Sequence, residues 1–366
     1  MHESAPVQPN SARPAPRQPT VATRLQWVDQ AKGIGIVLVV FGHVLDGVHN
    51  ARIPIDAFTF RLTWDALYSF HIPLFFFLSG LFFPHSWQQR GLRAVMLNKV
   101  DTLVYPYLLW SLLQGFTQVA LSQHVNNPVT AGEVLSLLWH PRQEFWFLYA
   151  LFFTYLIACV LYFFVPARQR WMLLLGAVAL YFLRTDIPRV AAIWYPAWYL
   201  VYFLAGAALQ RVARLITERT AISLPVAALV FGGAVAALHQ LSGQLAGGQS
   251  NPAISAANIV AAGAGTAMTL AVSALLARHG WNSMAYLGRM SLQVYLLHTT
   301  AAGFTRIVLQ KVLGVDNLQV HLVLGTAVGV GAPLLFAYLV DRWKIPGLFS
   351  LPRKLQLRRS AAPAPS

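Results

Sequence analysis

The chain has 366 residues, of which 57% are hydrophobic and only 11% are charged. Soluble domains carry about a quarter charged residues, and here the deficit extends along the whole chain. This composition excludes a soluble protein with a single anchor and predicts an integral membrane protein. The formal net charge is +15, but the basic residues lie between apolar segments, so membrane topology explains them better than nucleic-acid binding does.

The two ends of the chain are expected to be cytoplasmic tails. Residues 1–24 are polar and rich in proline, and they contain no apolar stretch that would serve as a cleavable signal peptide. We expect this stretch to be disordered, and we expect a second, basic tail over 346–366. The membrane domain is then predicted to cover 25–345. The single cysteine, Cys159, lies in an apolar run and has no partner for an intramolecular disulfide.

Ten apolar segments follow one another along the chain. They lie near 31–50, 64–84, 101–123, 145–165, 170–183, 194–210, 222–240, 254–276, 289–310 and 319–341. Most approach the ~20 residues that are needed to cross a ~30 Å hydrocarbon core. The fifth is short enough to be tilted or to enter the membrane without crossing it. The sequence therefore predicts an all-α, polytopic membrane bundle of about ten transmembrane helices.

The distribution of basic residues predicts the orientation of this bundle. With ten spans and a cytoplasmic N-terminus, twenty Lys and Arg residues fall on the cytoplasmic side and seven fall outside. Cytoplasmic loops of membrane proteins carry such an excess of positive charge. Omitting the short fifth span would place the basic C-terminus outside, so the bias favours ten crossings with both termini in the cytoplasm. The loops are too short for a soluble domain, and the chemistry is expected to lie in the bundle.

The first span carries four ionisable residues at or near membrane depth: Asp29, Lys32, His43 and Asp46. Ionisable groups are costly in a membrane, so each is a candidate for function. Lys32 and His43 are eleven residues apart, which places them ~20° apart around a helix and ~16 Å apart along it. If Lys32 lies at the cytoplasmic boundary, His43 lies near the middle of the membrane. The small residues of this span would allow a helix or ligand to approach closely, and they are Gly33, Gly35 and Gly42.

Structural explanations exist for each of these four residues. Lys32 could mark the cytoplasmic end of the helix by extending its amine to the interface, and Asp29 could pair with it there. His43 could be an interior histidine in a hydrogen bond between helices. Asp46 could face water at the outer boundary.

The second span contains the stretch FHIPLFFFLSG at 70–80. His71 is predicted near its outer end, and Pro73 should locally break the helix and free backbone groups. One interpretation is an acceptor site beside His43, to which Ser79 is a further candidate contributor. The other is a kinked packing helix with a histidine at the membrane boundary.

Further candidates for substrate binding occur before the fourth span and in the ninth. Arg142 and Trp146 could bind an acceptor sugar by charge and stacking, with Glu144 between them, or they could belong to an aromatic belt at the interface. Tyr295 and His298 lie on one helical face of the ninth span. That face could equally form a hydrogen-bond network between helices.

Several of these motifs together resemble acyltransferase family 3. The sequence motifs are WVDQAKG at 27–33, FHIPLFFFLSG at 70–80, WFL at 146–148 and QVYLLH at 293–298. A further motif is a basic residue and a histidine separated by ten residues, here Lys32 and His43. The spacing of basic residue and histidine is the most specific of them, with lysine here in place of the commoner arginine. The resemblance runs from about 25 to 342. It is greatest to the fucose-acetylase-like and exopolysaccharide acetyltransferase branch.

The resemblance implies an O-acetyltransferase of the bacterial inner membrane. Acetyl-CoA from the cytoplasm would be the donor co-substrate, with no further cofactor and no metal. The acceptor would be a hydroxyl of a cell-surface or secreted glycan, or of its lipid-linked precursor. A polytopic transporter or flippase of a polysaccharide export pathway is the alternative, and a structural subunit of such a pathway is a third possibility.

The resemblance also distributes roles among the candidates. His43 would either deprotonate the attacking hydroxyl or first accept the acetyl group itself, and Asp46 or a residue of another helix would orient its ring. Lys32 and Asp29 complete the expected catalytic set. The basic residues of the inner face would hold the phosphates of the donor, and the candidates are Lys32, Arg90, Arg93, Lys99, Arg211, Arg214 and Arg289.

Overall fold

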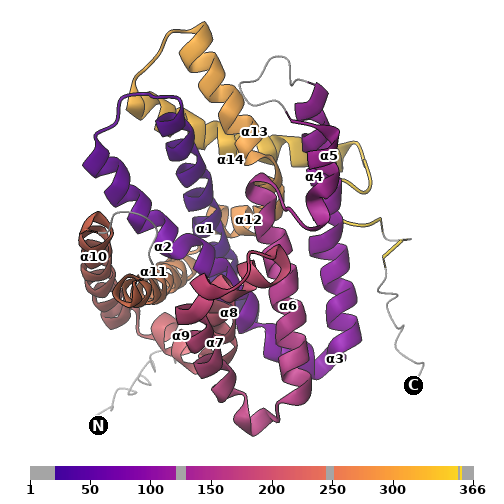
Figure 1. The fold of residues 1–366 in the computed structure, drawn as a ribbon, viewed down its shortest axis with the longest axis vertical. Coiled ribbons are helices and arrows are strands. Elements are labelled where there is room, and N and C mark those ends of the chain that lie inside the picture. Colours follow the sequence, from indigo (N-terminus) through magenta and orange to yellow (C-terminus); the bar gives the residue numbers. More distant parts are fainter. Residues whose placement is uncertain (1–20, 121–128, 245–250, 353–354, 357–366) are drawn as a thin grey trace, which may run out of the picture.

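The structure is a computed structural model that describes residues 21–120, 129–244, 251–352 and 355–356. These residues form α-helices joined by short 3-10 and π-helical turns, and no strand occurs among them. An all-α bundle is therefore confirmed (Figure 1).

Fourteen α-helices are found in the described parts of the chain. They are α1 (Val21–Asn50), α2 (Ala57–Leu81), α3 (Phe83–Lys99), α4 (Tyr105–Ala120), α5 (Ala131–Leu135), α6 (Trp146–Phe164), α7 (Trp171–Leu183), α8 (Ala191–Ala208), α9 (Gln210–Glu218), α10 (Thr220–Gln244), α11 (Pro252–Arg278), α12 (Asn282–Arg289), α13 (Ser291–Ile307) and α14 (Leu318–Arg342). Each of the ten apolar segments predicted from the sequence overlaps one or more of these helices, and positions 121–123 of the third segment lie outside the described residues.

The predicted number of about ten crossings is not confirmed. Among the described residues, six helices are long and apolar enough to cross a membrane, and a bent pair, Ala57–Leu81 with Phe83–Ala120, raises the number to seven if it forms one span. Helix α7 has only 13 residues and α13 has 17. At ~1.5 Å per residue they are ~20 and ~26 Å long, less than the ~30 Å of the hydrocarbon core.

Helix α1 occupies the middle of the bundle. It packs against α2, α11, α12, α13 and α14, and Figure 1 shows it between α2 and the α13–α14 pair. By contrast, α10 packs mainly against α11 and leaves large apolar side chains such as Leu229 and Ile222 exposed. An exposed apolar face of this kind suits contact with lipid tails, whereas the polar residues of α1 are enclosed by other helices.

Helix α2 continues through Pro73 to Leu81 without the predicted break. Proline in a membrane helix is tolerated where neighbouring groups satisfy the freed backbone carbonyl. Pro73 itself is buried among the surrounding helices. The bend occurs later, between α2 and α3, where the two helix axes differ by 65°.

Two pairs of helices approach each other so closely that only glycine fits between their backbones. A Cβ atom on Gly80 of α2 would lie 1.8 Å from the carbonyl oxygen of Phe203 in α8, and one on Gly206 of α8 would lie 2.1 Å from that of Phe77 in α2. Neither distance is compatible with any side chain. The α2–α8 pair therefore depends on both glycines.

The same arrangement joins α1 to α12. A Cβ atom on Gly33 would lie 2.1 Å from the carbonyl oxygen of Met284, and one on Gly288 would lie 1.7 Å from that of Asp29. The expectation that Gly33 allows another helix to approach is confirmed. The other two small residues of α1 face aromatic rings, Gly35 that of Phe75 and Gly42 that of Tyr68.

Because the Gly80 clash is with backbone, Gly80→Ala should force α2 and α8 apart. Overpacking typically costs about 1–3 kcal/mol, and backbone has less freedom to move aside than a side chain. We expect a lower melting temperature of the purified protein in detergent, measured by the loss of the monodisperse peak in size-exclusion chromatography after heating. Gly263→Ala is the matched control, because a Cβ atom on Gly263 of α11 would meet no atom within 4 Å. Equal stability of the two variants would contradict this account of the α2–α8 contact.

Candidate active site

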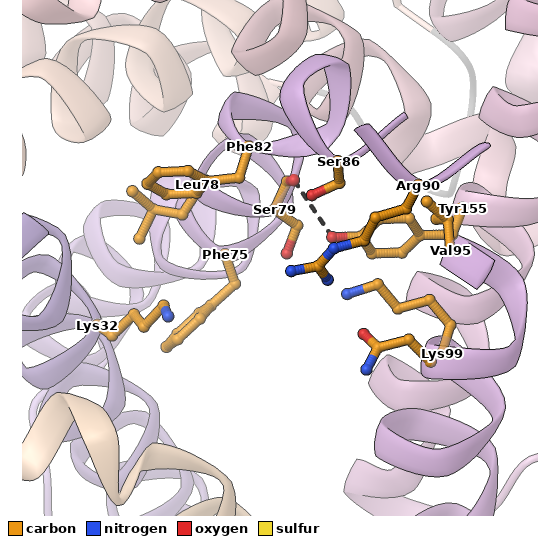
Figure 2. Close-up of a pocket in the computed structure, with 11 residues that line it drawn as sticks. Lys32, Phe75, Leu78, Ser79, Phe82, Ser86, Arg90, Val95, Lys99 and Tyr155 are labelled. Atoms are coloured by element: carbon orange, nitrogen blue, oxygen red, sulfur yellow. Dashed lines mark hydrogen bonds between the residues drawn. The ribbon is translucent and has the colours of Figure 1, made fainter. Parts of the chain in front are cut away.

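A cavity of about 240 Å³ lies between α1, α2, α3 and α6. Its wall is formed by Lys32, Phe75, Leu78, Ser79, Phe82, Ser86, Arg90, Val95, Asn98, Lys99 and Tyr155. Figure 2 shows Lys32 on one side of the open space and Arg90 with Lys99 on the other. None of the residues that form the wall is acidic, so three cations converge on one cavity without a neutralising carboxylate in it.

Aromatic and polar contacts hold the cationic side of this cavity. Lys99, the last residue of α3, places its Nζ 4.1 Å from the centre of the Tyr155 ring, a cation–π contact. The Tyr155 hydroxyl donates to the carbonyl oxygen of Ser79 at 3.2 Å (Figure 2). A π-helical turn, Val100–Val104, follows Lys99 directly, and such turns are frequent at functional sites.

Only some of the residues that were predicted to bind the donor line the cavity. Lys32, Arg90 and Lys99 share it, and Lys32 interacts electrostatically with Lys99. Arg93 is exposed. Outside the wall lie Arg93, Arg211, Arg214 and Arg289. Ser79 was grouped with the acceptor site, but it lies in this basic cavity.

A cluster of three histidines forms a second centre, about three helical turns further along α1. The rings of His43 and His298 are 5.0 Å apart between centroids, with an angle of 57° between their planes. His71 of α2 is also close enough to interact electrostatically with His43. His71 and His298 are completely enclosed, with exposed fractions of 2% and 0%, whereas His43 is half-buried.

Backbone hydrogen bonds fix the tautomers of the two enclosed histidines. The Nδ1 atom of His71 lies 2.6 Å from the carbonyl oxygen of Leu67, and that of His298 lies 2.7 Å from the carbonyl oxygen of Tyr295. A carbonyl oxygen can only accept, so both Nδ1 atoms carry the proton. In the neutral rings, Nε2 is then the basic nitrogen.

Asp46 is bonded to a tyrosine that was not among the predicted site residues. The hydroxyl of Tyr68 donates to Asp46 Oδ2, and its ring packs edge-on against His71 with centroids 4.8 Å apart. The Trp64 ring stacks on the Tyr68 ring, with centroids 3.8 Å apart. Tyr68 thus connects Asp46 to the His71 side of the cluster. The position of Tyr68, three residues before His71, was a signal in the sequence that a helical projection would have found.

The residues predicted around the start of α6 hold α13, which carries His298. The Glu144 carboxylate is buried and accepts a hydrogen bond of 2.5 Å from the Thr299 hydroxyl, and the Tyr295 hydroxyl donates to the Glu144 backbone carbonyl. These contacts lie on both sides of His298 in the sequence. They fit the interhelical network that was one of the two interpretations of this helix face.

Arg142 and Trp146 lie in different surroundings from the histidines. Arg142 donates to Gln118 at 3.4 Å beside a small cavity of about 10 Å³, which is room for about one water. Trp146 stacks on Tyr195 and Tyr199 of α8, with centroids 5.2 and 5.4 Å apart. The aromatic partners of Trp146 were missed, because nothing in the sequence indicates which helix lies opposite it.

Asp29 lies at the junction of α1 and α12. Its Oδ2 atom is 3.7 Å from the Arg289 guanidinium, and Asp29 also interacts electrostatically with Lys32. The Asp29 carboxylate thus interacts with two cations, Arg289 and Lys32, at the end of α1 that borders the basic cavity.

A family model of the acyltransferase domain matches residues 25–342 of the chain. The chain belongs to acyltransferase family 3. The resemblance suggested by the sequence motifs is thereby confirmed, and the match includes both the basic cavity and the histidine cluster.

Two curated relatives carry the name nodulation protein NolL. The one from Sinorhizobium fredii is 30% identical over 155 residues, which are 42% of this chain and 40% of the relative. The one from Mesorhizobium japonicum is 26% identical over 179 residues, 48% of this chain and 47% of the relative. The matched part is thus less than half the length of either relative. No solved structure matches this acyltransferase family 3 chain.

For this acyltransferase family 3 member we predict that His43→Ala abolishes acyl transfer. His43 is the half-buried member of a cluster whose other two histidines are sealed, so it is the ring that a substrate can reach. General acid–base help is worth about 10²–10⁴-fold, and loss of a covalent route would cost more. The measurement is transfer of label from acetyl-CoA in membranes, normalised to the amount of inserted protein. Acetylation at the wild-type rate would refute the catalytic assignment.

Proposed function

We propose that this protein is a membrane O-acetyltransferase. It would move an acetyl group from cytoplasmic acetyl-CoA to a hydroxyl of a cell-surface or secreted glycan, or of its lipid-linked precursor. The observation that carries the proposal is the pair of centres on α1, with Lys32 in a basic cavity and His43 in a histidine cluster. The two residues lie on one face of the helix, ~16 Å apart along its axis.

The basic cavity has the properties that a coenzyme A donor requires. Three cations in a wall that contains no acidic residue would bind its phosphates, and the apolar part of the wall, including Phe75 and Leu78, would contact the thioester arm. The wall also provides the hydroxyls of Ser79 and Ser86 as hydrogen-bonding partners. A long flexible arm is needed, because the phosphates and the reacting carbonyl would be held at different depths.

At the histidine cluster, His43 would act by one of two routes. As a base, it takes the proton of the acceptor hydroxyl while the oxygen bonds to the thioester carbon. The carbon–sulfur bond breaks, and the protonated His43 returns the proton to the departing thiolate. As a nucleophile, His43 first takes the acetyl group as the carbon–sulfur bond breaks and the thiolate departs. The acceptor hydroxyl then removes the acetyl group from His43 while its proton passes to the thiolate. Both routes begin from a neutral imidazole.

Lys32 variants test the assignment of the donor site. Lys32→Arg should keep substantial activity because it keeps the charge, whereas Lys32→Met should raise the KM for acetyl-CoA or abolish turnover. Lys32→Glu should be inactive, because it places a negative charge where phosphates approach. Rates of labelled acetyl transfer across a range of acetyl-CoA concentrations, together with membrane abundance, are the measurement.

Arg214→Met is the control for a general loss of positive charge, since Arg214 is exposed and paired with Glu218 at 2.8 Å. It should leave the KM for acetyl-CoA unchanged. A normally abundant Lys32→Met protein with an unchanged acetyl-CoA response would mean that Lys32 is only an interfacial anchor.

We further propose ten crossings of the bacterial inner membrane with both termini in the cytoplasm, on the strength of the charge bias. The single Cys159 is buried, so Cys159→Ser gives a background for single introduced cysteines. A membrane-impermeant maleimide should label Asp56→Cys and Asn251→Cys in intact spheroplasts. It should label Arg168→Cys and Arg214→Cys only after lysis.

Each outcome of the labelling identifies a specific arrangement. If Asp56→Cys is labelled in spheroplasts but Asn251→Cys is protected until lysis, the 13-residue helix α7 does not cross the membrane. The proposed count would then be wrong, while the orientation of the first half would stand. Labelling of Arg168→Cys in intact spheroplasts would contradict the orientation as well.

A further inference from the structure

His298 has one ring nitrogen whose hydrogen-bonding capacity is unused. Its Nδ1–H donates to the backbone of its own helix at Tyr295, and its Nε2 is buried without a hydrogen-bond partner among the described residues. A buried acceptor without a partner costs about 1–3 kcal/mol, and such groups in native structures call for a functional explanation. The ring has an exposed fraction of 0%, so bulk water does not supply the missing partner.

The residue that this nitrogen can serve is His43. The two rings are 5.0 Å apart between centroids, near enough for a rotation of the half-buried His43 ring to bring two nitrogens within hydrogen-bond distance. Catalytic hydrogen bonds are often long or misaligned before substrate binds. No other described residue forms a hydrogen bond with the His43 ring, so its tautomer is not fixed in any other way.

We propose that His298 is the positioning residue of His43: its Nε2 accepts a hydrogen bond from the N–H of His43. This inference rests on the proposed acetyl transfer and adds the group that orients its base. Because Nδ1 of His298 is committed as a donor, Nε2 can only accept while the ring is neutral. The nitrogen of His43 that faces His298 must therefore carry the proton, and the opposite nitrogen keeps the lone pair for the substrate.

The arrangement gives His298 the orienting role that a carboxylate has in a serine hydrolase triad, with a neutral acceptor in place of a charge. When His43 takes the hydroxyl proton, it becomes an imidazolium with two N–H groups. One of them remains bonded to His298, and the other returns its proton to the thiolate that leaves the thioester. In the covalent route the same bond holds the N–H while the opposite nitrogen attacks. His298 gains and loses no proton in either route.

Asp46 lies one turn from His43 on the same helix, but no hydrogen bond joins it to the His43 ring, and its Oδ1 is buried without a hydrogen-bond partner among the described residues. Its Oδ2 accepts from the Tyr68 hydroxyl, on the side of the cluster where α2 packs. Glu144, which is not part of α13, holds that helix by accepting a hydrogen bond from Thr299, the residue that follows His298. The position of the His298 ring is thus fixed independently of the His43 ring that it would orient.

Two substitutions of His298 and one matched control test the proposal. His298→Leu fills the space without an acceptor, and His298→Gln keeps an amide oxygen that accepts a hydrogen bond. His321→Leu is the control. Like His298, His321 is buried and donates to a backbone carbonyl oxygen, from its Nε2 to that of Val315 at 2.7 Å. Unlike His298, it lies on α14. The assay is the rate of [14C]acetyl transfer from acetyl-CoA to endogenous glycan in inverted membrane vesicles, per inserted protein, over a range of donor concentrations.

We expect His298→Leu to lower the maximal rate by about 10²-fold, the lower range for general-base help, with the KM for acetyl-CoA within threefold of wild type. His298→Gln should recover at least a tenth of the wild-type rate, and His321→Leu should keep it within threefold. A merely structural role for His298 would lower abundance in both His298 variants and would not separate leucine from glutamine. If His298→Leu does not insert, His298→Met takes its place.

Three results would overturn the proposal. They are a His298→Leu rate within threefold of wild type, an effect confined to the KM for acetyl-CoA, and equal losses in the leucine and glutamine variants. A wild-type protein that transfers no acetyl group while well inserted would instead refute the proposed function. A wild-type enzyme that is active, with His43→Ala inactive and His298→Leu unaffected, would refute this inference alone.

Discussion

The backbone contact between α1 and α12 is the constraint on which the site depends. At Gly33 and Gly288 the two helices meet without any side chain between them. The contact is secured by Gln30, whose amide donates to the Trp281 carbonyl oxygen at 2.8 Å, and by the Asp29–Arg289 pair. Since helices in lipid gain little from hydrophobic burial against one another, close packing and interhelical hydrogen bonds must determine where they lie. Lys32 is adjacent to Gly33, so this contact also fixes the depth of the basic cavity.

From that fixed point, the geometry of one helix sets the separation of the two centres. Lys32 and His43 can neither approach nor separate without unfolding α1, whose intervening residues Ile36 and Val40 are buried. The ~16 Å between them excludes direct proton exchange. In the proposed function, binding and chemistry would be divided along the helix, with the charged part of the donor at one end and its reacting part at the other. Anion binding would thereby be kept away from the centre of the bundle, where charge is most costly.

The sequence predicted what depends on composition and local spacing. The all-α bundle and the places of its apolar helices along the chain follow from composition and from patterns within single segments. What the sequence did not predict depends on which helix lies opposite which. The placement of Ser79 in the basic cavity, the exposure of Arg93 and the bond between Tyr68 and Asp46 are properties of helix pairs. The predicted break at Pro73 was wrong for the same reason, because packing around α2 outweighed a local preference.

The histidine cluster shows why such pairings decide the chemistry of a membrane enzyme. Taken along the chain, His43, His71 and His298 are three isolated polar residues in apolar helices, and each has an ordinary structural explanation. Only their juxtaposition distinguishes them: two are sealed and committed through Nδ1 to their own backbones, and the third is half-buried. A neutral histidine that is committed in this way can orient another histidine without introducing a charge, and a charge without a partner is what the interior of a membrane protein tolerates least. A carboxylate in the place of His298 would bind the imidazolium more strongly, but it would have to remain ionised in the same enclosed position before the reaction begins.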